Sequence, residues 1–451
     1  MSAANRSEVD NYAHYRAEGH RQPCGHGLIP TERYCEFERF DRRADFRGSF
    51  PRRRYAGFVV SAPSVLQLPA TPPGVRAYPG SISVGLLSTY PPTPCGLATF
   101  TAALAHGLSG TGADVNVVRV ADGSPARDGM VVGELVNGSA ASVAACSDLL
   151  SRNDIAVIQH EYGIYGGVDG DEIVDIIGDL DIPSIVVVHT VPESPTPHQR
   201  SALEMVAALA DQVVVMSESA RRRLCRGFHV DPSKVTTIPH GAVVPPHAPT
   251  KRAGRPTLLT WGLLGPGKGI ERVIDSMADL HQLNGRPRYL VAGRTHPKVL
   301  AADGEDYRDS CIEKARSKGL ADAVHFDSGY IGAASLSALL RAAAVVVLPY
   351  DSTEQVTSGV LVDAVANGRP VVATAFPHAV ELLGSGAGIV VGHDDPEALT
   401  QALRSVLTQP RLAGAMAAEA RRLAPAMAWS VIANAYQSAA RKILTDRTER
   451  R

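Results

Sequence analysis

The sequence predicts an α/β protein made of two Rossmann-like domains that face a cleft, each a parallel sheet with helices on both faces. From Ser81 onward, short runs rich in Val, Ile and Leu alternate with helix-like segments. Such continuous β-branched runs are typical of strands that are buried on both faces, as in parallel sheets. The alternation breaks once, in a Pro-rich connection at 239–256, and then restarts. At 451 residues the chain also exceeds one ordinary domain.

Composition narrows the class of protein. Apolar residues make up 45% and charged residues 20%, and the formal net charge of -1 gives no overall field that would recruit nucleic acid. The six cysteines are scattered and form no C-x-x-C pair, which predicts reduced thiols and neither a disulfide framework nor a zinc site. The N-terminus has no signal-peptide core, and no apolar run is long enough to span a bilayer. We therefore expect a cytoplasmic protein.

Four segments are predicted along the chain. Residues 1–78 are rich in Arg, aromatic residues and Pro and predict a flexible extension. This extension suits peripheral contact with an anionic inner membrane face or with a partner, but a solvated tail or a flap over the main body is the favoured interpretation. Residues 79–245 and 246–425 are the two Rossmann-like domains, and 426–451 is a helix that packs back across them.

The elements follow in order. In the first domain a strand at 81–88 leads into a helix at 95–112, and helices at 201–210 and 219–228 lie between later strands. In the second domain helices are predicted at 269–283, 335–343 and 358–368, and a long helix at 426–446 ends the pattern. The predicted strands are 81–88, 115–120, 155–161, 183–190, 212–217 and 235–239, and then 257–264, 288–293, 323–329, 344–350, 369–376 and 388–392.

Polar residues at predicted strand ends mark a site in the first domain, because ligands collect outside the carboxyl ends of parallel strands. Gly96 opens the helix after the first strand, where free amides and the helix dipole attract anions, although a plain turn explains it equally well. His189 ends one buried strand, and His160 and Glu161 end its neighbour. The segment HEYGI lacks the second His of H-E-x-x-H, which excludes a zinc-protease motif.

The second domain holds two Gly-containing loops before helices. Gly262 to Ile270 includes Lys268, but its spacing is not that of an ATP-binding P-loop. Lys268 can neutralise a diphosphate. In the segment 354–370, the amides of Thr357, Ser358 and Gly359 can hold a sugar or phosphate oxygen, and Asp363 can accept from a ribose hydroxyl.

Together these segments resemble the retaining glycosyltransferases of family 4, which have the GT-B fold, over roughly residues 81 to 440. The resemblance rests on CGLATF, VVVHT, VVVMSESA, TIPHGA, GLLGPGKGIE and VDAVANGRPVVAT. It implies transfer of a sugar, with a hexose favoured, from a nucleotide-diphosphate sugar held by the second domain to an acceptor held by the first. The acceptor is a glycan, a lipid-linked glycan or a small molecule. Neither a cofactor nor an obligatory metal is implied.

The resemblance also assigns roles to residues. Lys268 contacts the donor phosphates, His189 the transferred sugar, and Gly329 and Tyr330 border the base. The catalytic residues are His189, Lys268 and Gln355, and His160 and Glu161 lie on the acceptor side. The donor-binding residues are Gly96, Gly262, Lys268, Arg294, Gly329, Tyr330, Glu354, Gln355, Thr357, Ser358, Gly359, Val360 and Asp363.

Two departures from the family pattern leave alternatives open. Gln355 and Asp363 stand where the family often has acids eight residues apart, the second usually Glu. Leu263 stands where many members have an Arg, for which Arg294 or Arg341 are the substitutes. A catalytically silent nucleotide-sugar-binding protein of the same fold is therefore the main alternative. A nucleotide-sugar epimerase, a phosphorylase-like enzyme and a protein scaffold are others.

Overall fold

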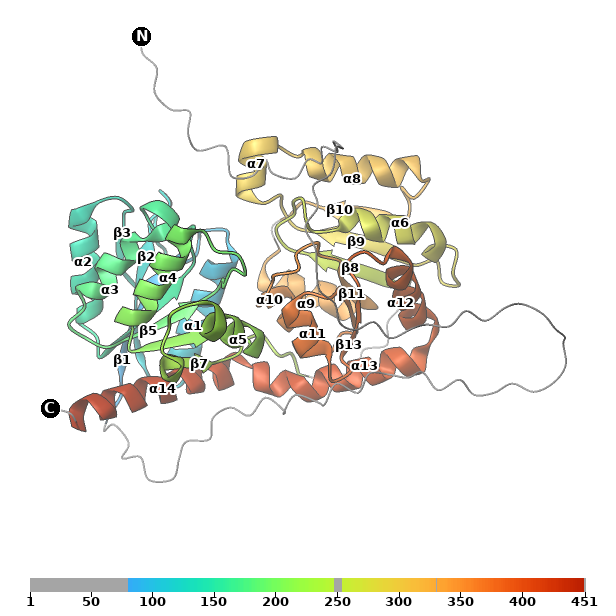
Figure 1. The fold of residues 1–451 in the computed structure, drawn as a ribbon. Coiled ribbons are helices and arrows are strands. Elements are labelled where there is room, and N and C mark those ends of the chain that lie inside the picture. The colour runs from blue at the N-terminus through green and yellow to red at the C-terminus, as the bar shows by residue number, and fades with distance from the viewer. Residues whose placement is uncertain (1–79, 247–253, 330, 450–451) are drawn as a thin grey trace, which may run out of the picture. The chain divides into compact units, whose positions relative to one another are not determined.

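The computed structural model describes residues 80–246, 254–329 and 331–449. The predicted extension at 1–78, with its proposed membrane contact, and Tyr330 lie outside the described residues. The described part contains two parallel sheets, each with its own helices (Figure 1). The limits of the predicted domains remain predictions.

The first sheet has seven strands in the order β3-β2-β1-β4-β5-β6-β7. All of its strand pairs are parallel, and β1 lies between β2 and β4. The direction of the strand order reverses between β1 and β4. The loops that follow these two strands therefore diverge to opposite sides, and the crevice between such loops is where sheets of this kind bind ligands. Its strands are β1 Ser83–Ser88, β2 Asp114–Val120, β3 Val131–Leu135, β4 Ile155–His160, β5 Ser184–Val188, β6 Gln212–Val215 and β7 Val235–Thr237.

Helices cover both faces of this sheet and bury one apolar cluster on each. Local capping signals mark where two of these helices begin. Thr196 caps the fourth helix in a capping box with Gln199, and Ser217 caps the fifth through Ala220 N. The helices are α1 Gly96–Gly110, α2 Ala140–Ser151, α3 Glu172–Gly178, α4 Pro197–Leu209 and α5 Glu218–Gly227, with short 3₁₀ turns at Val168–Gly170 and Pro232–Lys234.

The second sheet has six strands in the order β10-β9-β8-β11-β12-β13, again all parallel, and two further apolar clusters. Its strands are β8 Thr257–Trp261, β9 Arg288–Ala292, β10 Val324–Asp327, β11 Val345–Leu348, β12 Val371–Thr374 and β13 Gly388–Val391. Its helices are α6 Ile270–Leu280, α7 Pro297–Asp303, α8 Asp306–Ser317, α9 Ala333–Ala342, α10 Gly359–Ala366, α11 Pro377–Leu383, α12 Pro396–Thr408 and α13 Pro410–Leu423.

The last helix, α14 Trp429–Glu449, packs against the first sheet although it follows the second in sequence. After a 3₁₀ turn at Ala424–Met427, its residues Ile432, Ala433 and Tyr436 join the same apolar cluster as Phe100 and Leu104 of α1. The first domain therefore has a core that is completed only when the whole chain has been made.

The prediction of two parallel α/β sheets is confirmed, and every predicted strand is present. The structure adds β3, which the sequence analysis did not find. β3 lies at the edge of its sheet and contains Gly133, and its first four positions alternate between half-buried and exposed before the buried Leu135. A short edge strand of this kind lacks the continuous apolar run that marks the other strands. Among the helices that the structure describes, none is long and apolar enough to cross a membrane.

Candidate functional site

The predicted site residues gather at the carboxyl ends of the strands in both sheets. His189 directly follows β5, the Gly262–Gly269 loop follows β8, and the 349–358 loop follows β11. In parallel sheets these ends lie on one edge, so loops that are distant in sequence converge there. Contacts between the two sheets' loops, described below, place the first domain's residues beside those of the second.

Close backbone crossings shape the loop after β8. A Cβ atom on Gly293 would lie 2.0 Å from the carbonyl oxygen of Gly262, and one on Gly269 would lie 1.9 Å from that of Pro349. Both glycines have positive φ angles, +132° and +62°, which glycine adopts without strain. Gly262 lies near Val360 at the start of α10. The two predicted phosphate loops of the second domain are therefore in contact with each other.

Lys268 lies at the end of that loop, with its Nζ atom 4.4 Å from the centre of the Tyr350 ring. The side chain is partly buried, and burial lowers the pKa of its ammonium group. Lys268 forms an ion pair with no carboxylate among the described residues. A half-buried cation that is supported only by an aromatic ring is suited to bind an anionic ligand.

The start of α10 offers backbone amides, but fewer than the sequence predicted. Ser358 is the N-cap, and its hydroxyl accepts from Leu361 N. The Ser358 amide donates to Nδ1 of His378 over 2.8 Å, so in this structure it is engaged by a side chain. The amides of Gly359 and Val360, at the first two helical positions, remain as anion donors, and the buried Thr357 hydroxyl has no partner among the described residues.

The turn before α10 is held from the first domain. The Ser217 hydroxyl donates to the carbonyl of Val356 over 2.6 Å, and Val356 is part of a core cluster of the first sheet. Arg223 donates to the carbonyl of Glu354 over 2.6 Å, while the Glu354 carboxylate accepts from the Glu193 amide. Glu354 is thus engaged in holding the two domains together rather than open on the site.

Gln355 and Asp363 lie on either side of that turn. The Gln355 amide donates within its own turn to the Thr357 carbonyl, and its own carbonyl accepts from the His378 amide. Asp363 lies one turn into α10, and burial raises the pKa of its carboxyl group to about 7. No hydrogen-bond or ionic partner of the Asp363 carboxylate exists within the described part of the chain, so it is available to a ligand hydroxyl.

His189 and His160 are close to each other but differently placed. Nε2 of His189 lies 2.7 Å from Oε1 of Gln159, and the edge of the Phe100 ring packs against it. Burial, with His240 and His160 nearby, lowers the pKa of His189 to about 3, so the ring is neutral. His160 is 1% exposed and its Nδ1 atom has no partner among the residues described, which places it beneath the surface of the site.

Glu161 lies on the first domain's side of the site. Its carboxylate accepts from the Thr190 hydroxyl over 2.6 Å, and burial raises its pKa while Lys298 of α7 opposes that rise. The Lys298 ammonium also lies close to Gly163, so a cation of the second domain reaches this side. This arrangement fits a polar, hydroxyl-bearing ligand.

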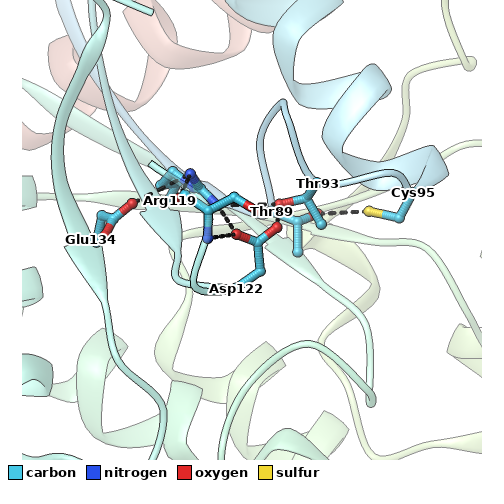
Figure 2. Close-up of polar contacts among 7 residues, drawn as sticks. Thr89, Thr93, Cys95, Arg119, Asp122 and Glu134 are labelled. Carbon is cyan, nitrogen blue, oxygen red and sulfur yellow. Dashed lines mark hydrogen bonds and ion pairs between the residues drawn. The ribbon is translucent and has the colours of Figure 1, made fainter. Parts of the chain in front are cut away.

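Gly96 begins α1 and is exposed, and a Cβ atom there would meet no atom within 4 Å. The loop before it is fixed by a buried arginine, as Figure 2 shows. Arg119 of β2 is 0% exposed, contacts Asp122 and Glu134, and donates to the Ser124 carbonyl over 2.7 Å. Thr93 of the loop donates to Asp122 and also accepts from Arg119. Arg119 was not among the predicted site residues.

Three further predicted residues lie at the margin. Gly329 is exposed, and its amide donates to Asp327. Arg294 is exposed and follows β9, at the correct edge of the second sheet. Arg341 is in the last turn of α9, which leads directly into the amino end of β11. That end of the sheet is opposite to the site. Arg341 therefore cannot take the place of the arginine that many family members have at the position of Leu263.

The structure brings in two histidines that the sequence analysis did not assign a role. His240 and His378 both contact the start of α10, the former at Gly359 and the latter at Ser358. His240 was part of the segment TIPHGA, so its position was visible in the sequence, whereas nothing around His378 marks it. No cluster of metal-ligating side chains occurs within residues 80–246, 254–329 and 331–449.

Two family models match the chain in succession. Residues 94–243 match the model described as Glycosyltransferase Family 4, and residues 246–423 match the one described as Glycosyl transferases group 1. Together the two matches span the described strands from β2 to β13.

Curated relatives agree with these matches. The chain is 28% identical over 306 residues to a D-inositol 3-phosphate glycosyltransferase of Kineococcus radiotolerans, covering 60% of this chain and 68% of that protein. It is 27% identical to the protein of the same name from Thermobifida fusca, covering 56% of this chain and 60% of that one. The chain thus spans between about half and two thirds of the curated relatives it matches.

Solved structures are similar in fold. A sucrose-phosphate synthase from Thermosynechococcus elongatus aligns with a TM-score of 0.63 and 19% identity, covering 81% of this chain and all of that one. Anabaena HepE in complex with UDP and glucose aligns with a TM-score of 0.62 and 16% identity, covering 79% of this chain and 98% of that one. At such identities the similarity concerns the fold, and these structures have the GT-B arrangement of two Rossmann-like domains.

Proposed function

Because the chain belongs to the group 1 glycosyltransferases of family 4, we propose that it is an enzyme that transfers a hexose, with retention of configuration, from a nucleotide-diphosphate sugar to a hydroxyl-bearing acceptor. The observation that carries this proposal is the ammonium of Lys268, which has no carboxylate partner among the described residues and lies over Tyr350 in a loop that contacts the start of α10. A cation and a helix N-terminus that share one site suit a diphosphate.

The donor is proposed to lie along the second domain's loops. The amides of Gly359 and Val360 donate to phosphate oxygens, and Lys268 balances their charge. The carboxylate of Asp363, which has no partner within the described part of the chain, accepts from a ribose hydroxyl. This set needs no metal ion for phosphate binding, and the proposal therefore includes metal independence. The bound UDP and glucose in Anabaena HepE make a uridine donor the first to test.

The transfer step is proposed to need no protein nucleophile. The bond between C1 of the sugar and the diphosphate oxygen breaks while the acceptor oxygen bonds to C1 on the same face. The proton of the acceptor hydroxyl passes to the departing diphosphate. Neutral His189 supports this step by hydrogen-bonding a hydroxyl of the sugar, because a neutral ring can accept or donate without adding charge. Gly359, Val360 and Lys268 stabilise the charge that develops on the leaving group.

The acceptor is proposed to lie on the first domain's side, between Glu161, Thr190 and the loop that ends at Gly96. Glu161 already accepts from one hydroxyl and lies within the electrostatic influence of Lys298. The names of the curated relatives make D-inositol 3-phosphate the first acceptor to test, and Lys298 is a cation that could meet its phosphate.

The decisive experiment is a panel of UDP-, GDP- and ADP-sugars, assayed for nucleoside diphosphate release with D-inositol 3-phosphate and simple glycans as acceptors. One donor is expected to be turned over equally with and without EDTA. Lys268→Ala is expected to lose about a hundredfold in turnover, since a single transition-state charge donor is worth this much. Lys442→Ala, which removes an exposed lysine on α14, is the control.

The second candidate function is a catalytically silent nucleotide-sugar-binding protein. It stays open because Gln355 and Leu263 both replace charged residues of the family pattern. Binding of a donor without turnover of any acceptor supports that candidate. Activity that EDTA abolishes contradicts metal independence, and inversion at C1 in the product contradicts retention. Absence of binding by every donor contradicts the proposed function as a whole.

A further inference from the structure

His240 lies directly beside the predicted phosphate site. Its Nε2 atom lies 2.8 Å from the position that a Cβ atom on Gly359 would occupy. Gly359 is the first residue of α10, where free amides point toward a bound anion. The absence of a side chain at Gly359 is what allows the imidazole to approach so closely. His240 comes from the segment after β7 and thus reaches α10 from the first sheet's side.

The orientation of the His240 ring is fixed. Its Nδ1 atom lies 2.6 Å from the carbonyl oxygen of Gly241, and because a carbonyl only accepts, Nδ1 must carry the proton. The Phe100 ring packs against it in a T-shaped arrangement and the Trp429 ring in a tilted one, with centroids 5.0 and 5.9 Å away. In the neutral ring Nε2 therefore presents a lone pair to the site, and it has no partner among the described residues.

That lone pair is unsuited to a phosphate oxygen. A neutral His240 with Nδ1 protonated would place acceptor against acceptor, whereas an imidazolium would donate from Nε2 to the phosphate. Without a ligand, burial lowers the pKa of His240 to about 4, while the contact with Gly241 opposes the shift. An anion at the start of α10 reverses the electrostatic balance and favours the protonated ring.

The neighbouring titratable groups do not compete for this role. His378 of α11 uses its Nδ1 to accept from the Ser358 amide, so protonating that atom would break the bond. His189, after β5, has Nε2 engaged with Gln159. Both rings lie close enough to His240 that its charge lowers their pKa values. No carboxylate of the described residues contributes to the pKa of His240.

We propose that His240 contacts the bound nucleotide sugar and takes up a proton from solvent when its diphosphate binds. The protonated ring then supplies a second positive charge beside Lys268, in place of the arginine that many family members have at the position of Leu263. This inference rests on the proposed function, since it needs a diphosphate at α10. It predicts that donor affinity rises as the pH falls from 8 to 6, by up to about tenfold per pH unit where the proton is fully taken up.

The test is isothermal titration calorimetry with the nucleotide sugar that binds best among UDP-glucose, GDP-mannose and ADP-glucose, without acceptor. Each phosphate of a nucleotide sugar carries a single, strongly acidic ionisable oxygen, so the ligand itself does not titrate in this range. Repeating the titration in phosphate and Tris buffers, whose ionisation enthalpies differ, counts the protons exchanged. Wild type is expected to take up a fraction of a proton near pH 7, and His240→Gln none.

Two further variants serve as a control and as an independent test of the position of His240. His281→Gln, at the end of α6 and remote from α10, is the matched control and is expected to retain proton uptake. Gly359→Ala retains His240 but pushes it away, and is expected to reduce uptake and affinity together. Thermal melts establish that each variant is folded.

The outcomes separate the two proposals. Donor binding without proton uptake in wild type, or equal uptake in wild type and His240→Gln, overturns the role of His240 and leaves the proposed function standing. If no nucleotide sugar binds to wild type, the proposed function fails and the role of His240 fails with it.

Discussion

Two strand-to-helix turns in this protein have the same local design but different surroundings. β1 leads into α1 through the N-cap Cys95 and the first helical residue Gly96, and β11 leads into α10 through Ser358 and Gly359. In each, the cap side chain accepts from the third helical amide. Yet a Cβ atom on Gly96 would meet nothing within 4 Å, whereas one on Gly359 would lie 2.8 Å from His240.

The difference shows that the same sequence signal serves two purposes. The turn before α1 is held within its own domain by the Arg119 network with Thr93 and Asp122. The turn before α10 is held by residues from elsewhere in the chain, including Ser217 through Val356 and His378 through Ser358. A change in the first turn should therefore affect mainly local stability, and a change in the second should also affect ligand binding.

The largest expected effect is in the first turn. Arg119→Met removes a guanidinium that is completely buried and leaves Asp122, Glu134 and the Ser124 carbonyl without it. Because its acidic partners are partly exposed, we expect the lower end of the cost of breaking a buried pair, about 3 kcal/mol of unfolding free energy. Urea denaturation measures it. Arg152→Met on the same domain is the control, and an equal loss in both variants would contradict the buried network.

The next effect concerns pH and the helix of the second turn. The carboxyl group of Asp363 has its pKa raised by burial to about 7, from 3.8 in the unfolded chain. Folding therefore favours its neutral form, and this contribution to stability is complete below about pH 4 and is lost as the pH rises toward 7. Asp363→Asn keeps the neutral shape at every pH. Relative to wild type, the variant should gain about 2 kcal/mol between pH 4 and 8, after allowance for partial exposure.

Denaturation of both proteins at pH 5 and pH 8 measures this gain. The comparison with wild type is needed because the buried histidines change stability with pH in the opposite direction to Asp363. Burial lowers the pKa values of His160 and His240 to about 4 and of His189 and His378 to about 3, so their contribution to stability is lost as the pH falls below about 6.5. A difference in unfolding free energy that is equal at the two pH values would contradict burial of Asp363.

A matched pair of glycine substitutions tests the comparison most directly. Gly359→Ala drives a methyl group into His240, and we expect a loss of about 1.5 kcal/mol, as for overpacking elsewhere. Gly96→Ala meets open space and should stabilise α1 by about 0.5 kcal/mol through the unfolded chain. Thermal and urea denaturation of the two variants should move in opposite directions. Equal changes would mean that the two turns have the same surroundings.

Effects smaller than that of Gly359→Ala are expected in the two N-caps. Ser358→Ala removes the hydroxyl that accepts from Leu361 N and should cost about 1 kcal/mol. Cys95→Ser replaces a weak sulfur acceptor, 3.4 Å from Ala98 N, by a strong one and should stabilise α1 by a few tenths of a kcal/mol, on the order of the differences among capping residues. Urea denaturation resolves the first change, and a rise in melting temperature reports the second.

Much of the fold was predictable because it depends on local patterns. Continuous Val and Ile runs predicted the strands of both sheets, and the break at 239–256 predicted that there were two. β3 was not found because an edge strand with alternating exposure lacks such a run. The candidate site residues near strand ends, including His189 and Lys268, could be proposed for the same reason, because parallel topology brings strand ends to one edge.

The sequence alone determined which turns could bind an anion, since Gly residues at helix starts and Lys268 are local features. Only the tertiary structure decided which amides are still free there, because His378 takes the Ser358 amide from 20 residues away. It also decided that α14 completes the first core and that His240 faces Gly359. Contacts between residues far apart in sequence depend on how elements pack, and propensity and periodicity carry no record of that packing.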